Sequence, residues 1–336
     1  MNTQSSSLDF YHYPVMLNEV IKISSPSKGG LFVDCTFGGG GYSSALLKYS
    51  KTNVIGIDRD KSVFSIAQKL ENKFKDRFKF YKLKFSEIDT ILNNHVDTVI
   101  FDLGISSIQL NDHNRGFSFK SKDKLDMTMG LSNLSAEQVV NNLSANQLKL
   151  IIKVFGEEKE ASKIASNIVK ARLRKKITRV DELVSIIEKS KKKNFSSKIN
   201  PSTKTFQALR IFVNKEISEL IKGITKATKL LKPGGKILIV SFHSIEDKII
   251  KYFFTNFSKN KSKPSRYFPE IKNSDSELFE RYINKVIKPS IHELEKNNPS
   301  RSAKLRYAIR SKNKFIYPDG LMQKFSKYLK LEAINV

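Results

Sequence analysis

The chain has 336 residues and a formal net charge of +27 at neutral pH, because 60 Lys and Arg face 33 Asp and Glu. With 39% hydrophobic and 28% charged residues, it has the composition of a folding chain and not of a disordered tail. The single cysteine, Cys35, excludes a disulfide framework, and five scattered histidines give no zinc-site spacing, so we expect no metal. Single cores stop growing at roughly 250 to 300 residues, so this length predicts two structural units.

Residues 1–10 lack the basic and apolar regions of a secretory signal, and no run approaches the roughly 18 apolar residues of a membrane span. We therefore expect a cytoplasmic protein without a membrane partner. The charge of +27 indicates a polyanion as partner, because each Lys or Arg placed on a phosphate releases condensed counterions. A chain rich in Lys, Asn and Ile can also reflect an AT-rich genome, so charge alone makes nucleic acid only the leading hypothesis.

The first third of the chain alternates short apolar strands with helical segments. The predicted strands are residues 31–33, 53–57, 78–83 and 96–101. Four consecutive glycines, Gly38–Gly41, follow the first strand and precede a helical segment at 43–49, while Asp58 and Asp102 end the second and fourth strands. Strands separated by helices predict an α/β fold with a doubly wound, mostly parallel, Rossmann-like sheet covered on both faces.

No strand is predicted between about residues 113 and 206. Helix starts recur there as capping boxes, with Ser135 three residues before Gln138 and Ser144 three residues before Gln147. The stretch holds 20 Lys and Arg against 9 Asp and Glu, a denser positive charge than the chain average. We therefore predict an inserted, all-helical, basic domain at 113–206 that recognises RNA, within a sheet domain made of 1–112 and 207–336.

The last third of the sequence returns to the sheet. One long helix is expected from about Thr205 to the Pro-Gly-Gly stop at 233–235, followed by a strand at 236–242. A helix at 244–254 is predicted to have Ser244 as its N-cap. Residues 304–310 alternate strictly between apolar and polar, which predicts a half-exposed strand at the sheet edge.

The glycine turn and the acids near it indicate a nucleotide-type cofactor. Glycines let a ligand approach the backbone closely, and Asp58 lies 20 residues after Gly38, the offset of a carboxylate that binds ribose hydroxyls. A nicotinamide dinucleotide fingerprint needs a third glycine where Ser43 or Ser44 stands, and Asp34 would repel a pyrophosphate but attract an ammonium group. The pattern therefore favours S-adenosylmethionine over a nicotinamide cofactor, with a purely structural glycine turn as the alternative.

Two further side chains are candidates for contact with a substrate. Asp102 and the small residues after it lie at the carboxyl edge where such sheets bind ligands, which suits a base amine entering beside a cofactor. An ordinary loop aspartate would show the same pattern. His243 follows the last parallel strand at the same edge and could either contact a substrate or sit at a helix start.

A series of short motifs occurs in order along the chain. They are His12–Met16, Val33–Gly41, Gly56–Asp60, Asp102–Ser107, Arg115–Phe119, Leu125–Met127, Gly156–Glu158, Thr205–Arg210, Ser241–Asp247 and Arg301–Arg306. In these motifs the sequence resembles the RsmH (MraW) family of small-subunit ribosomal RNA methyltransferases, over nearly its whole length from His12 to Arg310. So many motifs in one order make an accidental similarity very improbable.

The resemblance implies a class I methyltransferase sheet that uses S-adenosylmethionine to methylate N4 of one cytidine in the decoding centre of 16S rRNA, near the P site. The partner would be 16S rRNA or the small ribosomal subunit. By matching motifs, it implies that the cofactor is bound by Gly40, Gly41, Tyr42, Asp58, Phe85, Asp102 and Gln109. Asp102 is then also the first candidate catalytic residue and His243 the second. A non-catalytic factor that binds cofactor and rRNA during assembly is the alternative, against which the presence of both Asp58 and Asp102 argues.

The sequence departs from the family pattern at several positions. Tyr42 replaces a common His, Ile108 a Pro, Thr128 an Arg, Asn200 a His and Lys204 an Arg. A glycine turn contributes mainly backbone, so the cofactor site is expected to be retained, whereas Thr128 and Asn200 remove side chains that could touch RNA. The candidate RNA face of the insert comprises Arg172, Arg174, Lys175, Lys176 and Lys191–Lys193.

Overall fold

The computed structural model describes residues 14–93, 95–191, 200–259 and 277–336. The chain divides into two compact units. Unit 1 comprises residues 1–85, 89–104 and 227–316, and unit 2 comprises residues 86–88, 105–226 and 317–336.

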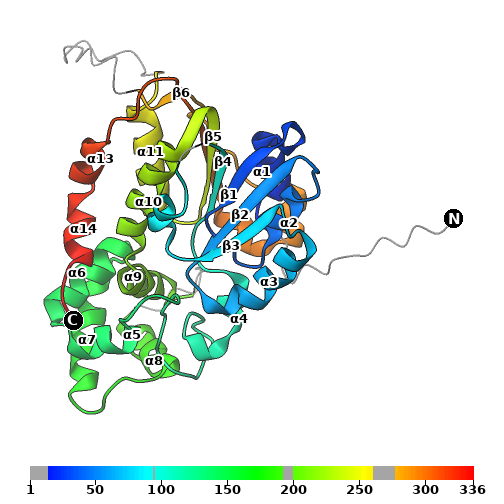
Figure 1. Cartoon of the computed structure of the whole chain (residues 1–336). Helices are drawn as coiled ribbons and strands as arrows, with labels where there is room; N and C mark the ends of the chain where they lie inside the picture. The colour runs from blue at the N-terminus through cyan, green and yellow to red at the C-terminus, as the bar shows by residue number, and fades with distance from the viewer. Residues whose placement is uncertain (1–13, 94, 192–199, 260–276) are drawn as a thin grey trace, which may run out of the picture. The chain divides into compact units, whose positions relative to one another are not determined.

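Unit 1 is built on one seven-stranded sheet, with the strand order β3-β2-β1-β4-β5-β7-β6 (Figure 1). The strands are β1 (Gly30–Asp34), β2 (Thr52–Asp58), β3 (Phe78–Lys82), β4 (Val96–Asp102), β5 (Leu231–Ser241), β6 (Phe279–Tyr282) and β7 (Lys304–Arg310). The first five run parallel to one another, and β7 pairs antiparallel with both β5 and β6. The predicted doubly wound, mostly parallel sheet is therefore confirmed, and the strand order reverses between β1 and β4, where such sheets bind ligands.

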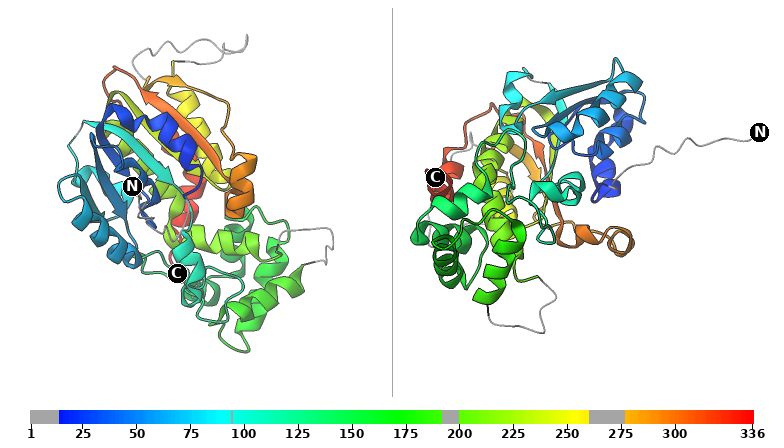
Figure 2. Two further views of the ribbon diagram at one scale, coloured as in Figure 1. Left: turned by 90° about the vertical axis from the view of Figure 1, so that its right-hand side faces the viewer. Right: turned by 90° about the horizontal axis from the view of Figure 1, so that it is seen from below.

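Helices cover both faces of this sheet because its central strands are apolar on both sides. Residues 99–101 of β4 and 237–240 of β5 are fully buried, the pattern of parallel strands that lie between two helical layers. The helices α1 (Leu17–Ser24), α2 (Gly41–Leu46) and α3 (Phe64–Lys73) lie along one face, and α11 (Ser244–Asn256) lies along the other (Figures 1 and 2). The short helix α12 (Ile291–Lys296) precedes β7 in the chain.

The strand β7 was expected at the sheet edge, and this prediction is wrong because β6 pairs with its outer side. Its polar positions are partly buried: the Arg306 guanidinium is only 6% exposed, donates to Asp247 Oδ1 at 2.7 Å and to the Tyr282 hydroxyl at 2.7 Å. Lys304 Nζ lies 3.0 Å from Asp247 Oδ2. An alternating pattern with buried ion pairs on one face thus looks like an edge strand in sequence.

Unit 2 consists of helices joined by loops. Its helices are α4 (Ser107–Asn111), α5 (Ala136–Asn142), α6 (Ala145–Phe155), α7 (Ala161–Arg172), α8 (Val180–Ser190), α9 (Thr203–Asn214), α13 (Asp319–Lys324) and α14 (Ser326–Glu332), with α10 (Glu216–Leu230) passing from unit 2 into unit 1. Both predicted capping boxes are confirmed, since Ser135 caps α5 with Gln138 and Ser144 caps α6 with Gln147. The predicted insert, residues 113–206, lies inside this unit.

The single long helix expected after Thr205 is in fact two helices, because Lys215 has a left-handed backbone with φ of 50°. Asn214 stabilises the break: its amide nitrogen donates to the Met127 carbonyl at 2.8 Å, and its oxygen accepts from Met129 N at 2.7 Å. Arg210 and Glu216 form an ion pair across the break, with Arg210 Nε 2.9 Å from Glu216 Oε1. No glycine or proline marks this position, so the sequence pattern predicts one continuous helix.

Candidate cofactor and active site

The strand register brings three aspartates, Asp34, Asp58 and Asp102, to the carboxyl edge of the unit 1 sheet. Asp34, at the end of β1, pairs with Gly56 of β2 and Ile100 of β4. Asp102, two residues beyond Ile100, pairs with Val240 of β5, and its N–H donates to the Thr36 hydroxyl at 2.6 Å. Parallel strands end at a common edge, so these acids lie on one side of the sheet.

The glycine turn connects β1 to α2. Gly40 N donates to the Phe37 carbonyl at 2.7 Å, and Gly40 has φ of +72°, which an L-residue rarely adopts. A Cβ at Gly40 would lie 2.8 Å from the Phe37 ring, and a Cβ at Gly41 would lie 2.7 Å from Pro14. A Cβ at Gly39, by contrast, would meet nothing within 4 Å, so the backbone of the turn is open at this position.

Asp58 fastens this turn to the end of β2. Its Oδ2 accepts from Gly38 N at 2.9 Å, and its Oδ1 accepts from Asp60 N at 2.9 Å. Burial raises the pKa of Asp58, while the two N–H donors act to lower it. Each carboxylate oxygen keeps a second lone pair, so Asp58 can still accept from ribose hydroxyls.

Asp34 is fully buried, and both of its oxygens are used within the fold. Ser43 Oγ donates to Asp34 Oδ2 at 2.8 Å, and Thr36 N donates to Asp34 Oδ1 at 3.4 Å. Burial raises the pKa of Asp34 to about 6, and the Ser43 bond counteracts part of that rise. The carboxyl that the sequence suggested for an ammonium group therefore also holds α2 in place.

Asp102 differs from the other two aspartates because one of its oxygens is left over. Asp102 Oδ1 is buried and has no hydrogen-bond partner among the described residues. Burial raises the pKa of Asp102 well above its usual range, and Asp34, Glu246 and Glu293 raise it further. A buried carboxylate oxygen without a partner is costly, so it indicates a place that a ligand completes.

Tyr42 lies inside the fold beside Asp102. Its side chain is 3% exposed, and its hydroxyl donates to the Val15 carbonyl. The same segment is held from the far end of the sequence, since Met16 N donates to Glu293 Oε1 at 2.6 Å. Glu293 could not be predicted from the sequence, because no local pattern indicates a contact between residues 277 positions apart.

Phe85 and Gln109, the remaining predicted cofactor residues, have different surroundings. The half-buried Phe85 ring packs edge-to-face on Phe101 with centroids 5.3 Å apart, which leaves part of the ring for another contact. Gln109, in unit 2, forms a capping box at the start of α4: its oxygen accepts from Ser106 N at 3.1 Å, and its own N–H donates to Ser106 Oγ at 3.2 Å. The Ser-x-x-Gln spacing of Ser106 and Gln109 is the sequence signal that predicts this box.

His243 is the N-cap of α11, so the prediction that Ser244 has this role is wrong. Its Nδ1 accepts from Glu246 N at 3.5 Å, and Glu246 Oε2 in turn accepts from Phe242 N at 2.9 Å and His243 N at 3.3 Å. The imidazole competes successfully with the serine because it reaches the first turn of the helix from one residue earlier. Of the two roles left open for His243, the structure shows the helix start.

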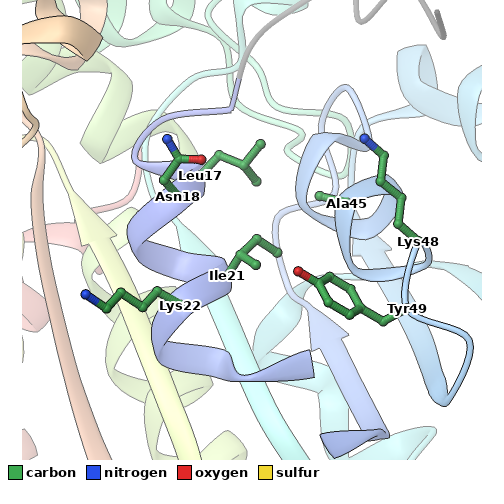
Figure 3. Close-up of a pocket in the computed structure, with 7 residues that line it drawn as sticks. All are labelled: Leu17, Asn18, Ile21, Lys22, Ala45, Lys48 and Tyr49. Carbon is green, nitrogen blue, oxygen red and sulfur yellow. The ribbon is translucent and has the colours of Figure 1, made fainter. Parts of the chain in front are cut away.

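A separate hollow lies between α1 and the end of α2 (Figure 3). Its volume is about 420 Å³, and its lining residues are Leu17, Asn18, Ile21, Lys22, Ala45, Lys48 and Tyr49. Figure 3 shows Leu17 and Ile21 of α1 pointing toward the side of Ala45 and Tyr49, while the Lys22 side chain runs away from the tyrosine ring. It contains no acid and none of the predicted cofactor residues, so it is not the site that the sequence predicts.

In unit 2, most of the basic side chains considered for RNA binding are already bonded. Three of them form ion pairs: Lys175 with Glu182 at 2.7 Å, Lys176 with Glu137 at 2.8 Å and Lys191 with Glu158 at 2.5 Å. Arg172 donates to the carbonyls of Val140 and Leu143 at 2.8 and 2.6 Å, so it holds helices together. Arg174 is exposed, and residues 192–193 lie outside the described residues.

Two of the departures from the family pattern are also engaged within unit 2. Thr128 Oγ1 donates to Asp126 Oδ2 at 2.9 Å. Asn200 Oδ1 accepts from Ser202 N at 2.8 Å, just before α9 begins. Both side chains therefore have local structural roles.

Taken with the glycine turn and the acids at the ends of β1, β2 and β4, the sheet order with its antiparallel β7 defines a class I S-adenosylmethionine-dependent methyltransferase. The model of the MraW methylase family matches residues 9–311, and the chain belongs to this family. The predicted resemblance, the methyltransferase class and S-adenosylmethionine as cofactor are thereby confirmed.

Two relatives with 41 to 43% identity agree with this assignment. The chain is 43% identical to the ribosomal RNA small subunit methyltransferase H of Ehrlichia ruminantium over 307 residues, which cover 89% of this chain and 99% of the relative. It is 41% identical to the protein of the same name from Bartonella grahamii over 308 residues, covering 92% of each. Among solved structures, an rRNA methylase from Streptococcus thermophilus aligns with a TM-score of 0.39 and 10% identity, over 87% of this chain and 96% of that one. Within the part of the chain that the structure describes, no helix is long and apolar enough to cross a membrane.

Proposed function

We propose that this chain methylates the exocyclic N4 of one cytidine in the decoding centre of small-subunit 16S rRNA, in the cytoplasm. The relatives named as ribosomal RNA small subunit methyltransferases support the class of substrate. The position of the methylated atom rests on the family motifs, above all Asp102–Ser107 at the end of β4. The net charge of +27 agrees with an RNA substrate, because it draws the protein to a polyanion.

The observation that carries the proposal is the unpartnered Oδ1 of Asp102 at the carboxyl edge of the sheet. The residues present fit S-adenosylmethionine: Asp58 for ribose hydroxyls, Phe85 and Asp102 beside the adenine or the methyl donor, and the backbone of Gly40 and Gly41 along the methionine part. Asp102 meets a specific condition of the fit because it has an acceptor to spare, and the turn is open beside Gly40 at Gly39. Bound there, the cofactor supplies a methyl group activated by a sulfonium.

Asp102 is the group that we place next to the reacting amine. Cytosine N4 is a weak nucleophile because its lone pair is delocalised into the ring. A hydrogen bond from the amine to the Asp102 carboxylate, or to the backbone carbonyl after it, helps to localise that pair on nitrogen. Holding the amine in line with the methyl group can contribute up to roughly 7 to 11 kcal/mol in favourable intramolecular cases. The base must leave its stack first, which an irregular rRNA segment makes easier.

The helical residues 113–206 of unit 2 are the proposed RNA-recognition domain. Arg174 is the first candidate contact, because it is exposed at the end of α7. The surface ion pairs of Lys175 and Lys176 are weakly held, so these lysines can turn to phosphates when RNA binds. His243 is not part of this proposal, since its ring caps α11.

The proposal is tested by methyl transfer from labelled S-adenosylmethionine to unmethylated small subunits and, separately, to deproteinised 16S rRNA, with mass spectrometry of the product nucleosides. We expect N4-methylcytidine from at least one substrate. The variant Asp102→Asn should lose most of the rate. A matched control is Asp97→Asn at the other end of β4, where the carboxylate accepts from Leu31 N at 2.9 Å and takes no part in the site. Cofactor binding without transfer to either RNA would instead support a non-catalytic assembly factor.

A further inference from the structure

Several carboxyl groups gather around the tip of β4, and one of them, Glu246, has its Oε1 3.1 Å from His243 Nε2. Besides Asp102 Oδ1, the Oε2 atom of Glu19 is buried and has no hydrogen-bond partner among the described residues. Glu246 and Glu293 are 3% and 7% exposed. Together with Asp34, these residues form what we call the acidic edge: Glu19, Asp34, Asp102, Glu246 and Glu293.

Hydrogen bonds connect Asp34, Asp102 and Glu293 through the backbone around them. The Thr36 hydroxyl, two residues after Asp34, accepts from Asp102 N at 2.6 Å. On the other side, the Tyr42 hydroxyl bonds to the Val15 carbonyl, and the next residue, Met16, donates to Glu293 Oε1 at 2.6 Å. The acids therefore belong to one small region of unit 1 and act on one another.

The electrostatics of this region are dominated by burial and by like charge. Burial is the largest influence on the pKa of Asp34, Asp102 and Glu293, and it raises all three. The charges that raise them further are carboxylates in each case, and no Lys or Arg of the described chain is among the main influences. A region dominated by carboxyl groups is unusual in a chain with a net charge of +27.

We infer that the acidic edge makes the cofactor site selective for a cation, so that it binds S-adenosylmethionine in preference to S-adenosylhomocysteine, with Asp102 as the specificity-determining residue. The inference rests on the proposed role of Asp102 in cofactor binding. S-adenosylmethionine has a sulfonium and an ammonium against one carboxylate, a net charge of +1, whereas S-adenosylhomocysteine is neutral overall. A neutral ligand of the same shape would fill the same space without compensating the negative charge of the carboxylates.

The selectivity follows the course of the reaction. A new C–N bond forms from the N4 lone pair while the C–S bond breaks and its electron pair returns to sulfur, and N4 then releases one proton to water. The acidic edge then faces a ligand that has lost its sulfonium charge. Asp102 therefore favours the donor before transfer and loses its hold on the product afterwards, which helps the product to leave.

The same groups predict a pH dependence. Facing Asp102 are Asp34 from β1, Tyr42 from α2, Glu246 from α11 and Glu293 from α12. Because burial raises its pKa, Asp102 must release a proton to meet a cation. S-adenosylmethionine should thus bind more tightly as the pH rises and release protons as it binds, while S-adenosylhomocysteine should show little of either effect.

The test is titration calorimetry of the full chain with each of the two ligands at about pH 6 and about pH 8.5, in two buffers of different ionisation enthalpy. The expected result is a preference for S-adenosylmethionine that grows about tenfold with pH. In Asp102→Asn the dissociation constant of S-adenosylmethionine should rise about tenfold more than that of S-adenosylhomocysteine, and in Asp97→Asn neither should change. Equal weakening of both ligands in folded Asp102→Asn would show a hydrogen bond without charge selection and would overturn the inference.

The wild-type chain gives a second, independent measurement. If Asp102→Asn fails to fold, proton release by the wild type on binding S-adenosylmethionine, and not on binding S-adenosylhomocysteine, still supports the inference, and equal release for both refutes it. Tight binding of both ligands without selectivity refutes the inference and leaves the proposed methyl transfer intact. Binding of neither ligand overturns the inference and the proposed cofactor site together.

Discussion

The glutamate near the end of the chain, Glu332 of α14, predicts a measurable pH dependence of stability. It is 3% exposed, and its two oxygens accept from the first-turn N–H groups of α10, Ile217 N at 2.8 Å and Ser218 N at 2.9 Å. Burial raises its pKa from 4.5 to about 7, more than these donors lower it. The folded protein therefore holds the proton more tightly than the unfolded chain does.

The sign follows from proton linkage. Between about pH 4.5 and about pH 7 the folded state binds more protons at this group, so the free energy of unfolding falls as the pH rises. Below this window the group contributes its full stability, and above it the contribution is gone. A shift of about 2.5 in pKa corresponds to about 3 kcal/mol. Glu332→Gln keeps an acceptor for one N–H and cannot ionise. The free energy of unfolding of this variant minus that of wild type should therefore increase by about 3 kcal/mol as the pH rises across the window.

Urea unfolding followed by far-UV circular dichroism, at about pH 5 and about pH 8, measures this difference. The matched control is Glu188→Gln, the same change at an exposed position of α8 in the same unit. Subtracting the wild-type values removes the other groups with raised pKa, such as Asp34, because they are present in both proteins. The reasoning is refuted if the gap between Glu332→Gln and wild type stays constant, or shrinks, as the pH rises.

Three further substitutions test other parts of the structure. Gly40→Ala, at φ of +72° and with its Cβ 2.8 Å from Phe37, should cost about 1 to 2 kcal/mol and weaken S-adenosylmethionine binding in calorimetry, whereas Gly39→Ala should fold normally. Asn214→Ala removes the hydrogen bonds to Met129 N and to the Met127 carbonyl and should lower the free energy of unfolding by about 2 to 4 kcal/mol in urea, with no loss if water replaces both bonds. Arg174→Ala should weaken filter binding to 16S rRNA and flatten its salt dependence without changing cofactor affinity, and unchanged RNA binding would remove this residue from the proposed interface.

The site could be predicted from the sequence wherever one strand end determined it. Parallel strands bring their carboxyl ends to one edge, so acids placed directly after apolar runs, such as Asp34, Asp58 and Asp102, had to lie near one another. The glycine turn could also be predicted, because its left-handed backbone at Gly40 excludes most other residues.

What could not be predicted depends on contacts distant in sequence or on competition between neighbouring side chains. Glu293 reaches Met16 across 277 residues, and no periodicity encodes such a contact. His243 and Ser244 are both suitable caps, and only the geometry of Glu246 decides between them. The break at Lys215 has no glycine or proline, since the Asn214 side chain stabilises it through bonds to residues 127 and 129.

The proposed function requires one chain to attract two ligands of opposite charge. The net charge of +27 acts over the Debye length, about 8 Å at physiological ionic strength, on a polyanion outside the protein. Buried carboxylates such as Asp102 act in a region from which water is excluded, where a single charge is screened far less. Salt should therefore weaken RNA binding steeply while it leaves the affinity for S-adenosylmethionine nearly unchanged. A cofactor affinity that falls with salt as steeply as RNA binding would show that the acidic edge is open to solvent, and charge selection by Asp102 would then be too weak to matter.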